Sequence, residues 1–413
     1  MRVREPWGRR VSEFRAPPQA DFQAYADLVG HQGEHFGLMV PWSGTQCAST
    51  GGLDGALLLP LMEIVPEVAQ FFNGKLSQCQ RGMGLVAAKI HTTSDDYTRT
   101  DQAAATELRS LYPDAFAGFP DIGVLPSGSL LGNFTDEDVQ FKEPPSVDDT
   151  TSKSIHLALT LASNSSDLKA AEHAFKWCTG QSLVELILTP LVGAYGRLRY
   201  LHDAYDQLGD AAYTVAGCLR KASWKLGSEW TGQTATAFDQ YLFSWSMGIG
   251  GIGDAAKIVA KAYKDGYDVI ILLVRSALGK IGELLDNEIA ALADQFAKMI
   301  AGDAAIEAVG LGPEDPVADV IAGFWTADRL YKMYKIVRAI INTIGVIQSI
   351  FAQIVAAVKS IKAKVKQVTD FVGSPPSYGS LIDDVQQRGF EFEKSGGWSP
   401  DLGATRIGLL PAA

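Results

Sequence analysis

The sequence predicts an all-α protein built from long antiparallel helical hairpins, with an extra C-terminal helical region and a flexible tail. Three observations support this prediction. Apolar residues recur at intervals of three and four over long stretches, short Gly-rich breaks separate these stretches, and almost nothing has the alternation of a β-strand. A long amphipathic helix needs a partner for its apolar face, so neighbouring helices are expected to fold back on each other.

The first predicted unit is a helical hairpin over residues 1–111. Helical patterns cover 19–36 and 56–111, and a Gly/Ser/Thr-rich break from Ser43 to Gly55 separates them. Residues 112–152 are predicted to form a linker, because prolines, glycines and an acidic Asp-Glu-Asp cluster replace the helical pattern.

The second unit, residues 153–310, carries the clearest helical signal. Its first apolar stripe comprises Leu191, Tyr195, Leu198, Leu201, Tyr205, Leu208, Ala212, Val215, Leu219, Ala222 and Leu226. Gly227 and the Trp230–Gly232 segment interrupt this pattern, and a second helix is expected to start near Thr231 or Gln233. Its stripe comprises Phe238, Tyr241, Trp245, Ile252, Val259, Tyr263, Ile270, Val274, Ala277, Ile281 and Leu285.

A third helical region is predicted over residues 316–372, followed by a flexible Gly/Ser/Pro-rich tail over 373–413. Its centre, Ala339–Val358, is uncharged and long enough to span a bilayer. An amphipathic helix packed on the bundle is favoured, because polar and apolar residues separate onto two sides. The polar side holds Asn342, Ser349 and Gln353, and the apolar side holds Ile336, Ile340, Ile347, Phe351, Ile354 and Val358.

The break between the two stripes contains the pattern W-x-G-x-x-A-x-x-F, formed by Trp230, Gly232, Ala235 and Phe238. Glycine permits the unusual backbone of a tight turn between helices, and the small Ala235 permits close helix approach. Phe238 can anchor the apolar seam of the hairpin. A tryptophan at the tip is costly to expose, so Trp230 is expected to have a receptor or a packing partner.

With this motif between two amphipathic stripes, residues 191 to about 300 resemble the WxG secreted proteins and the PPE domains of actinobacterial type VII (ESX) secretion. In those families the W-x-G motif lies at the turn of a helical hairpin. The resemblance implies that Trp230 is held out at the tip for recognition by the export machinery.

The same families carry a second export element, Y-x-x-x-D or Y-x-x-x-E, which displays a tyrosine and an acid on one helical turn. Tyr97 and Asp101 match this element late in the first hairpin. The arrangement resembles PE and PPE proteins, whose two elements combine into a composite signal; here one chain would carry both, as in EspB-like substrates. Trp42-Ser43-Gly44 leaves open that residues 19–111 form a complete WxG hairpin.

Composition limits the function classes. The formal net charge of -11 disfavours a general nucleic-acid binder. The N-terminal residues lack the apolar run of a Sec signal peptide. Four cysteines, Cys47, Cys79, Cys178 and Cys218, form no CxxC pair; they can be buried thiols or two disulfides whose pairing stays open.

The function that the resemblance implies is that of a non-enzymatic type VII substrate, secreted or held in the cell envelope, with a structural or interaction role after export. Its implied partners are the secretion ATPase and a cytoplasmic chaperone or paired WxG protein. Homo-oligomerisation stays open, and no cofactor or metal is expected. The alternative is a membrane-active effector in which residues 336–366, flanked by lysines and arginines, contact a membrane surface.

Two further motifs are interpreted structurally. His31-Gln32-Gly33-Glu34-His35 matches the zinc-binding pattern H-x-x-E-H, but no downstream acid stands out as a third ligand, so solvated or capping histidines are expected. The run from Gly248 to Gly253 matches G-x-G-x-x-G without the preceding strand that a dinucleotide site needs. A hinge or a close-packing point in the second helix is expected there.

Overall fold

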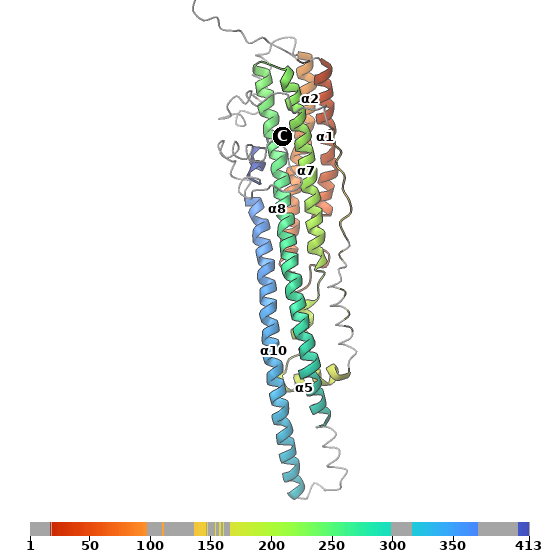
Figure 1. The fold of residues 1–413 in the computed structure, drawn as a ribbon, viewed down its shortest axis with the longest axis vertical. Helices are drawn as coiled ribbons and strands as arrows, with labels where there is room; N and C mark the ends of the chain where they lie inside the picture. Colours follow the sequence, from red (N-terminus) through yellow and green to blue (C-terminus); the bar gives the residue numbers. More distant parts are fainter. Residues whose placement is uncertain are drawn as a thin grey trace, which may run out of the picture.

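The computed structural model describes residues 17, 19–96, 110, 136–145, 147, 153, 157, 160, 166–298, 316–370 and 404–412. In this part of the chain the protein is mostly helical, and no strand occurs. The prediction of an all-α fold is confirmed. The long helices run roughly along a single axis of the molecule (Figure 1).

The first two long helices, α1 (Gln19–Thr45) and α2 (Leu61–Asp96), form a hairpin. Near its end, α1 passes through Pro41, although proline lacks the N–H group that an interior helical residue donates. After the proline, the hydroxyl of Thr45 donates to the Pro41 carbonyl at 2.8 Å in the last turn. The helix continues beyond its predicted end at residue 36.

A second hairpin consists of α7 (Gly196–Glu229) and α8 (Gln233–Glu283). α8 begins at one of the two predicted starting residues. Every residue predicted for the two apolar stripes is buried, except Leu285, which is partly buried. Residues Leu284–Ile289 form a π-helix, which changes the helical repeat, and Leu284 is buried instead.

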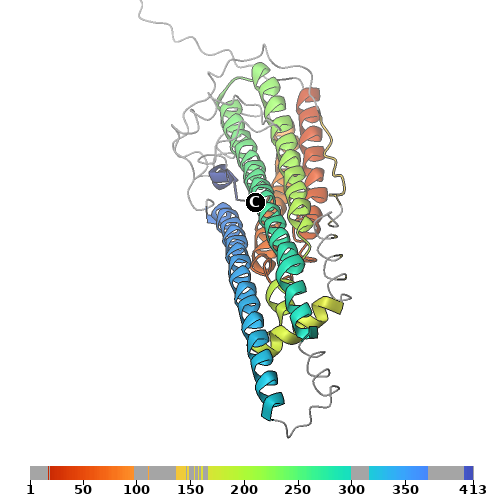
Figure 2. The same ribbon diagram turned by 60° about the horizontal axis from the view of Figure 1, so that its bottom comes forward.

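The two hairpins pack side by side around one hydrophobic core (Figures 1 and 2). Two side-chain hydrogen bonds fix α1 against α7. The Tyr25 hydroxyl donates to the Leu219 carbonyl at 3.4 Å, and the Trp42 indole N–H donates to the Ala204 carbonyl at 2.9 Å. Because residue numbers rise on one helix as they fall on the other, α1 and α7 are antiparallel.

The long helix α10 (Pro316–Asp370) packs along α8 and reaches α2, where Lys362 pairs with Glu63 at 2.8 Å. Its predicted apolar face is in the core: Ile340, Ile347, Phe351, Ile354 and Val358 are buried, and Ile336 is partly buried. Asn342, Ser349 and Gln353 are exposed. The prediction of an amphipathic helix packed on the bundle is confirmed.

Beyond one end of α1, α2 and α7, the helices α8 and α10 continue as a pair (Figures 1 and 2). Three short helices pack near this end: α5 (Ser166–Thr179), α6 (Leu183–Ile187) and η1 (Thr189–Leu191). With 51 residues, α8 is about 75 Å long and joins this end to the four-helix part.

Two segments predicted to be loose pack on the helices. Residues 136–145, inside the predicted linker, are non-helical, and Val139 among them is buried. At the chain end, η4 (Ala404–Leu409) packs on α8 with Ile407 buried. The prediction of a flexible tail is wrong for residues 404–412, because composition reports local preferences and cannot reveal a docking surface elsewhere in the chain.

Candidate functional site at the turn between α7 and α8

The turn between α7 and α8 contains Trp230 and Gly232, as the motif predicts. Trp230 ends α7 in an extended conformation (φ −117°, ψ 123°), and its backbone N–H donates to the Gly227 carbonyl at 3.4 Å. Gly232 precedes α8 with φ 129° and ψ 177°, a conformation that side-chain-bearing residues rarely adopt. The glycine carbonyl accepts the first bond of α8, from the Thr236 N–H at 3.1 Å.

The indole of Trp230 is not held out into solvent, which corrects the expectation from the resemblance. It is only 3% exposed, because two aromatic rings cover it. Phe22 of α1 meets it edge-on with ring centroids 4.8 Å apart, and Phe238 of α8 lies 5.1 Å away. Ala235 is also buried, so the four motif residues form one packed unit at this end of the bundle.

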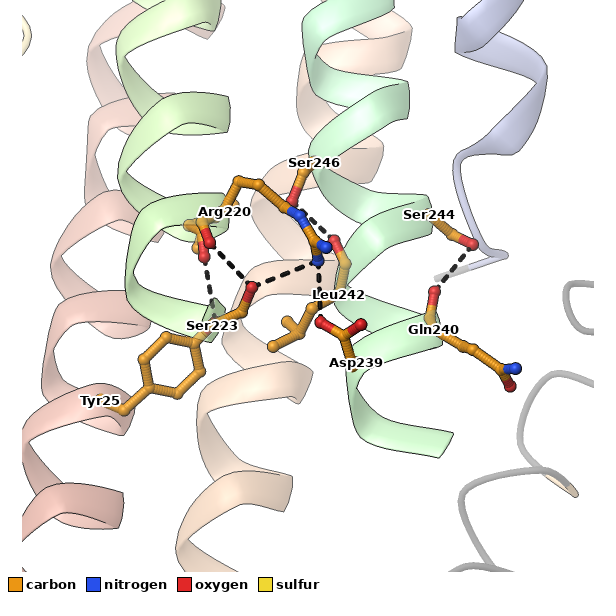
Figure 3. Close-up of polar contacts among 9 residues, drawn as sticks. Tyr25, Arg220, Ser223, Asp239, Gln240, Leu242, Ser244 and Ser246 are labelled. Carbon is orange, nitrogen blue, oxygen red and sulfur yellow. Dashed lines mark hydrogen bonds and ion pairs between the residues drawn. The ribbon is translucent and has the colours of Figure 1, made fainter. Parts of the chain in front are cut away.

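A buried charged network lies between α7 and α8 on the bundle side of the turn (Figure 3). Arg220 of α7 is 1% exposed and pairs with Asp239 of α8 at 2.8 Å. The guanidinium also donates to the Ser223 hydroxyl at 3.4 Å and lies over the ring of Trp224 at 4.7 Å. The ion pair connects the two helices within three turns of the motif.

Burial and charge act in opposite directions in this network. Burial lowers the pKa of Arg220, and the adjacent Asp239 carboxylate raises it again. Burial raises the pKa of the Tyr25 hydroxyl far above its usual value, while the positive charge of Arg220 lowers it. Tyr25 packs edge-on against Phe238 at 5.8 Å, so the network and the motif share a neighbour.

Arg220 and Asp239 are not among the residues predicted from the sequence, although their charges and positions give a signal. In a hairpin that turns at residues 230–232, residues at similar sequence distances from the turn lie opposite each other. Arg220 lies ten residues before Trp230 and Asp239 seven residues after Gly232, which is within one helical turn of facing positions. Opposite charges near such positions favour an ion pair across the hairpin.

Few residues of the turn are accessible to a partner. Thr231 and Gln233 are exposed, and so are Gly227 and Ser228 at the end of α7. Tyr97 and Asp101, the other predicted half of the export signal, lie outside the described residues. α2, whose described part ends at Asp96, runs antiparallel to α1, so it ends near Phe22 and the turn.

Trp42, in the second W-x-G sequence, does not lie in a tight turn. It belongs to the last turns of α1, and fifteen residues separate the end of that helix from the start of α2. Its ring stacks on Phe141 at 4.3 Å, which fixes the segment 136–145 against α1. Trp42 therefore makes a packing contact within the protein and is only partly exposed.

The glycine run of α8 is a close-packing surface. A Cβ atom at Gly248 would meet Leu410, one at Gly251 would meet Arg406 and Ile407, and one at Gly253 would meet Tyr213. The absent side chains thus make room for η4 and for α7. This confirms the close-packing interpretation of the glycine run.

The histidine pair of α1 has acidic neighbours that are distant in the sequence. Asp136 lies 2.7 Å from His31, and Asp138 lies 3.7 Å from it. The expectation of solvated or capping histidines is wrong for His35, which is buried. The two acids did not stand out in the sequence, because the segment 136–145 returns to α1 from more than 100 residues away. Sequence spacing could not reveal this proximity.

The four cysteines are free thiols, which decides between the two alternatives left open by the sequence. Cys47, Cys79 and Cys218 are buried, and Cys178 is exposed. Burial raises the pKa of all four thiols. A raised pKa lowers the thiolate fraction, so none of them has the electrostatic setting of a reactive cysteine.

Comparisons with protein-family models, curated proteins and solved structures give no match for this chain. The assignment of a function therefore depends on the residues and the geometry described above.

Proposed function

We propose that this protein is a substrate of a type VII (ESX) secretion system and acts after export as a structural or interaction protein. The proposed mechanism is recognition and not catalysis. The protein would be secreted or held in the cell envelope. Its partners would be the secretion ATPase and a cytoplasmic chaperone or paired WxG protein, and it can also assemble with copies of itself.

The observation that carries the proposal is the placement of the W-x-G motif at the turn of a long helical hairpin. Gly232 has a positive φ there, so the glycine has a backbone reason to be present. The motif residues Trp230, Ala235 and Phe238 pack together instead of being scattered over the surface. A chance W-x-G triplet has no reason to coincide with such a turn.

Because Trp230 is buried, a partner would reach the surface around the indole and not the indole itself. Since Phe22 of α1 covers the indole, a partner would contact the combined end of both hairpins. Thr231 and Gln233 are exposed at that end and would form part of the contact surface. Tyr97 and Asp101 follow α2 in the sequence and remain the proposed second half of a composite signal.

Export from a cell that carries an ESX system tests this proposal. Trp230→Phe keeps an aromatic ring in the core, and Thr231→Arg changes only an exposed residue of the turn. Thr231→Arg changes the proposed contact surface and is expected to reduce secreted protein by about tenfold or more, as for the loss of a binding hot spot. Trp230→Phe acts only through the packing beneath that surface, because the indole is buried, and is expected to reduce secreted protein less. Intracellular amount and helical circular dichroism should stay unchanged. Trp177→Ala, which removes an exposed tryptophan of α5, is the matched control.

Normal export of both turn variants, with folding preserved, would contradict the proposal. Tyr97→Ala and Asp101→Ala extend the same assay to the second element. If only the turn variants lose export, the signal consists of the turn alone and the composite form is wrong.

A membrane-active effector is the second candidate, and α10 favours it. Among the described residues, Ala327–Thr369 is the one helix that could cross a membrane by length and composition, and 33% of its most apolar window is buried. Tyr331, Ile341 and Val346 are exposed on its outer side. Apolar residues beside lysines and arginines are typical of helices that lie on anionic membranes.

Flotation with vesicles separates the two candidates. The effector would co-float with vesicles containing phosphatidylglycerol and much less with neutral vesicles. Replacing Ile341 and Val346 together by glutamate should abolish flotation while leaving the helical content unchanged, because both side chains are exposed. Absence of flotation with either kind of vesicle would remove this candidate.

A further inference from the structure

Two histidines and an aspartate from distant parts of the chain converge beside α1. His31 and His35 are one helical turn apart, with ring centroids separated by 4.7 Å. Asp138 comes from the non-helical segment 136–145. One ligand atom from each of the three residues lies within 4.8 Å of the other two. Two histidines at positions i and i+4 with a carboxylate make a common ligand set for zinc.

A second carboxylate orients His31. The Nδ1 atom of His31 lies 2.7 Å from Asp136 Oδ2, so a proton on Nδ1 completes this hydrogen bond. Its Nε2 atom then faces Asp138 Oδ1 at 3.7 Å with a free lone pair. Asp136 is itself fixed by the Gln32 amide, which donates to its Oδ1 atom at 2.6 Å. Histidines that ligate metals commonly donate their other N–H to a carboxylate in this way.

The third observation concerns His35, which is only 6% exposed. Its Nε2 atom is buried without a hydrogen-bond partner. A buried polar atom without a partner is unfavourable, and most such atoms in native proteins have one. Burial and the neighbouring His31 lower the pKa of His35, whereas Asp138, Asp136 and the Glu137 carbonyl act in the opposite direction.

We propose that His31, His35 and Asp138 bind a zinc-class divalent cation, with Asp136 as the residue that positions His31. Zinc bonds of about 2.0–2.2 Å place tetrahedral ligand atoms about 3.3 Å apart. The three atoms must therefore approach by about 1 Å or more, and the exposed Asp138 side chain is the one free to move. Its exposure also leaves the fourth position open to water.

The consequence of binding is structural. Asp138 belongs to the segment between the two hairpins, so the cation would fasten this segment to the first helix of the bundle. The inference does not depend on the proposed export function, because none of its residues belongs to the turn between α7 and α8.

Binding of Zn²⁺ to the full-length protein tests the proposal. Isothermal titration and elemental analysis after dialysis should show one bound zinc per chain. Co²⁺ in the same site should give the d–d absorption of a four-coordinate ion. Asp138→Asn should lose this binding without loss of fold, because Asp138 is exposed. Asp136→Asn should weaken binding by about 10- to 100-fold, as for other groups that orient a ligand.

The matched controls are His91→Ala and Asp54→Asn, which change an exposed histidine and an exposed aspartate elsewhere. Both should bind zinc as the unchanged protein does. Zinc should also raise the melting temperature of the unchanged protein and of the controls but not of Asp138→Asn. Absence of stoichiometric zinc, or equal affinity in Asp138→Asn and the unchanged protein, would overturn the proposal.

Discussion

Gly232 is the residue of the α7–α8 turn whose backbone conformation most restricts which amino acid can occupy the position. Its φ of 129° lies in a region that side chains disfavour. Gly227, five residues earlier, is also at this end of the hairpin, but it has an ordinary helical backbone and nothing lies within 4 Å of where a Cβ atom would be. A comparison of the two positions therefore distinguishes one where the backbone conformation requires glycine from one where it does not.

Gly232→Ala is expected to destabilise the protein by about 1–3 kcal/mol, the cost of an L-residue in such a backbone conformation. Gly227→Ala should be neutral or stabilise it by up to about 1 kcal/mol, because alanine restricts the unfolded chain and favours helix. Urea unfolding followed by circular dichroism measures both changes. Equal effects of the two substitutions would contradict the role assigned to Gly232.

The residues of the turn were predictable to different degrees. Trp230, Gly232, Ala235 and Phe238 were identified because the motif is contiguous and its residue types have direct physical roles. The burial of Trp230 under Phe22 was not, because it depends on how one hairpin packs against the other. Local patterns report which residues tend to be apolar or flexible, whereas the partner of a side chain is set by tertiary packing.

At the scale of elements, the same distinction explains the success with α7, α8 and α10 and the failure with η4. The three long helices have a continuous apolar face, which periodicity reveals without knowledge of the partner. η4 is a short helix in a Gly/Ser/Pro-rich region, and it is held by the surface that Gly248 and Gly251 leave open on α8. Only the complementarity of two distant segments explains its position.

Substitution of Gly251 tests this docking surface. A methyl group at this position would meet backbone atoms of Arg406 and Ile407, which cannot move aside as a flexible side chain can. Gly251→Ala is expected to destabilise the protein by about 1–3 kcal/mol through overpacking, despite the better helix propensity of alanine. Hydrogen exchange of residues 404–412 should accelerate together with this loss.

Gly279→Ala is the matched control on the same helix, because nothing lies within 4 Å of the added methyl group. It should gain up to about 1 kcal/mol from helix propensity and leave the exchange of residues 404–412 unchanged. Similar behaviour of the two variants would show that η4 does not depend on the glycine surface.

On the scale of the whole molecule, a buried ion pair joins the end of the chain to the centre of the bundle. Arg406 of η4 contacts Asp254 of α8, and both are almost fully buried. Asp254 also accepts a hydrogen bond from the Tyr213 hydroxyl of α7 at 2.5 Å. Three segments of the fold thus meet at one carboxylate, and its charge is compensated by the arginine.

Arg406→Met should therefore destabilise the protein while keeping the C-terminal segment in place. Asp254 would keep the Tyr213 hydroxyl and lose its counter-charge, and breaking a buried pair in this way costs about 3–5 kcal/mol. Asp254→Asn alone should also destabilise the protein, because Arg406 then stays buried without its partner. In the Arg406→Met variant the same substitution should raise stability, because it removes the uncompensated charge. The midpoint of urea unfolding measures this reversal of sign, and a loss of stability from Asp254→Asn in both backgrounds would show that the ion pair does not anchor the C-terminal segment.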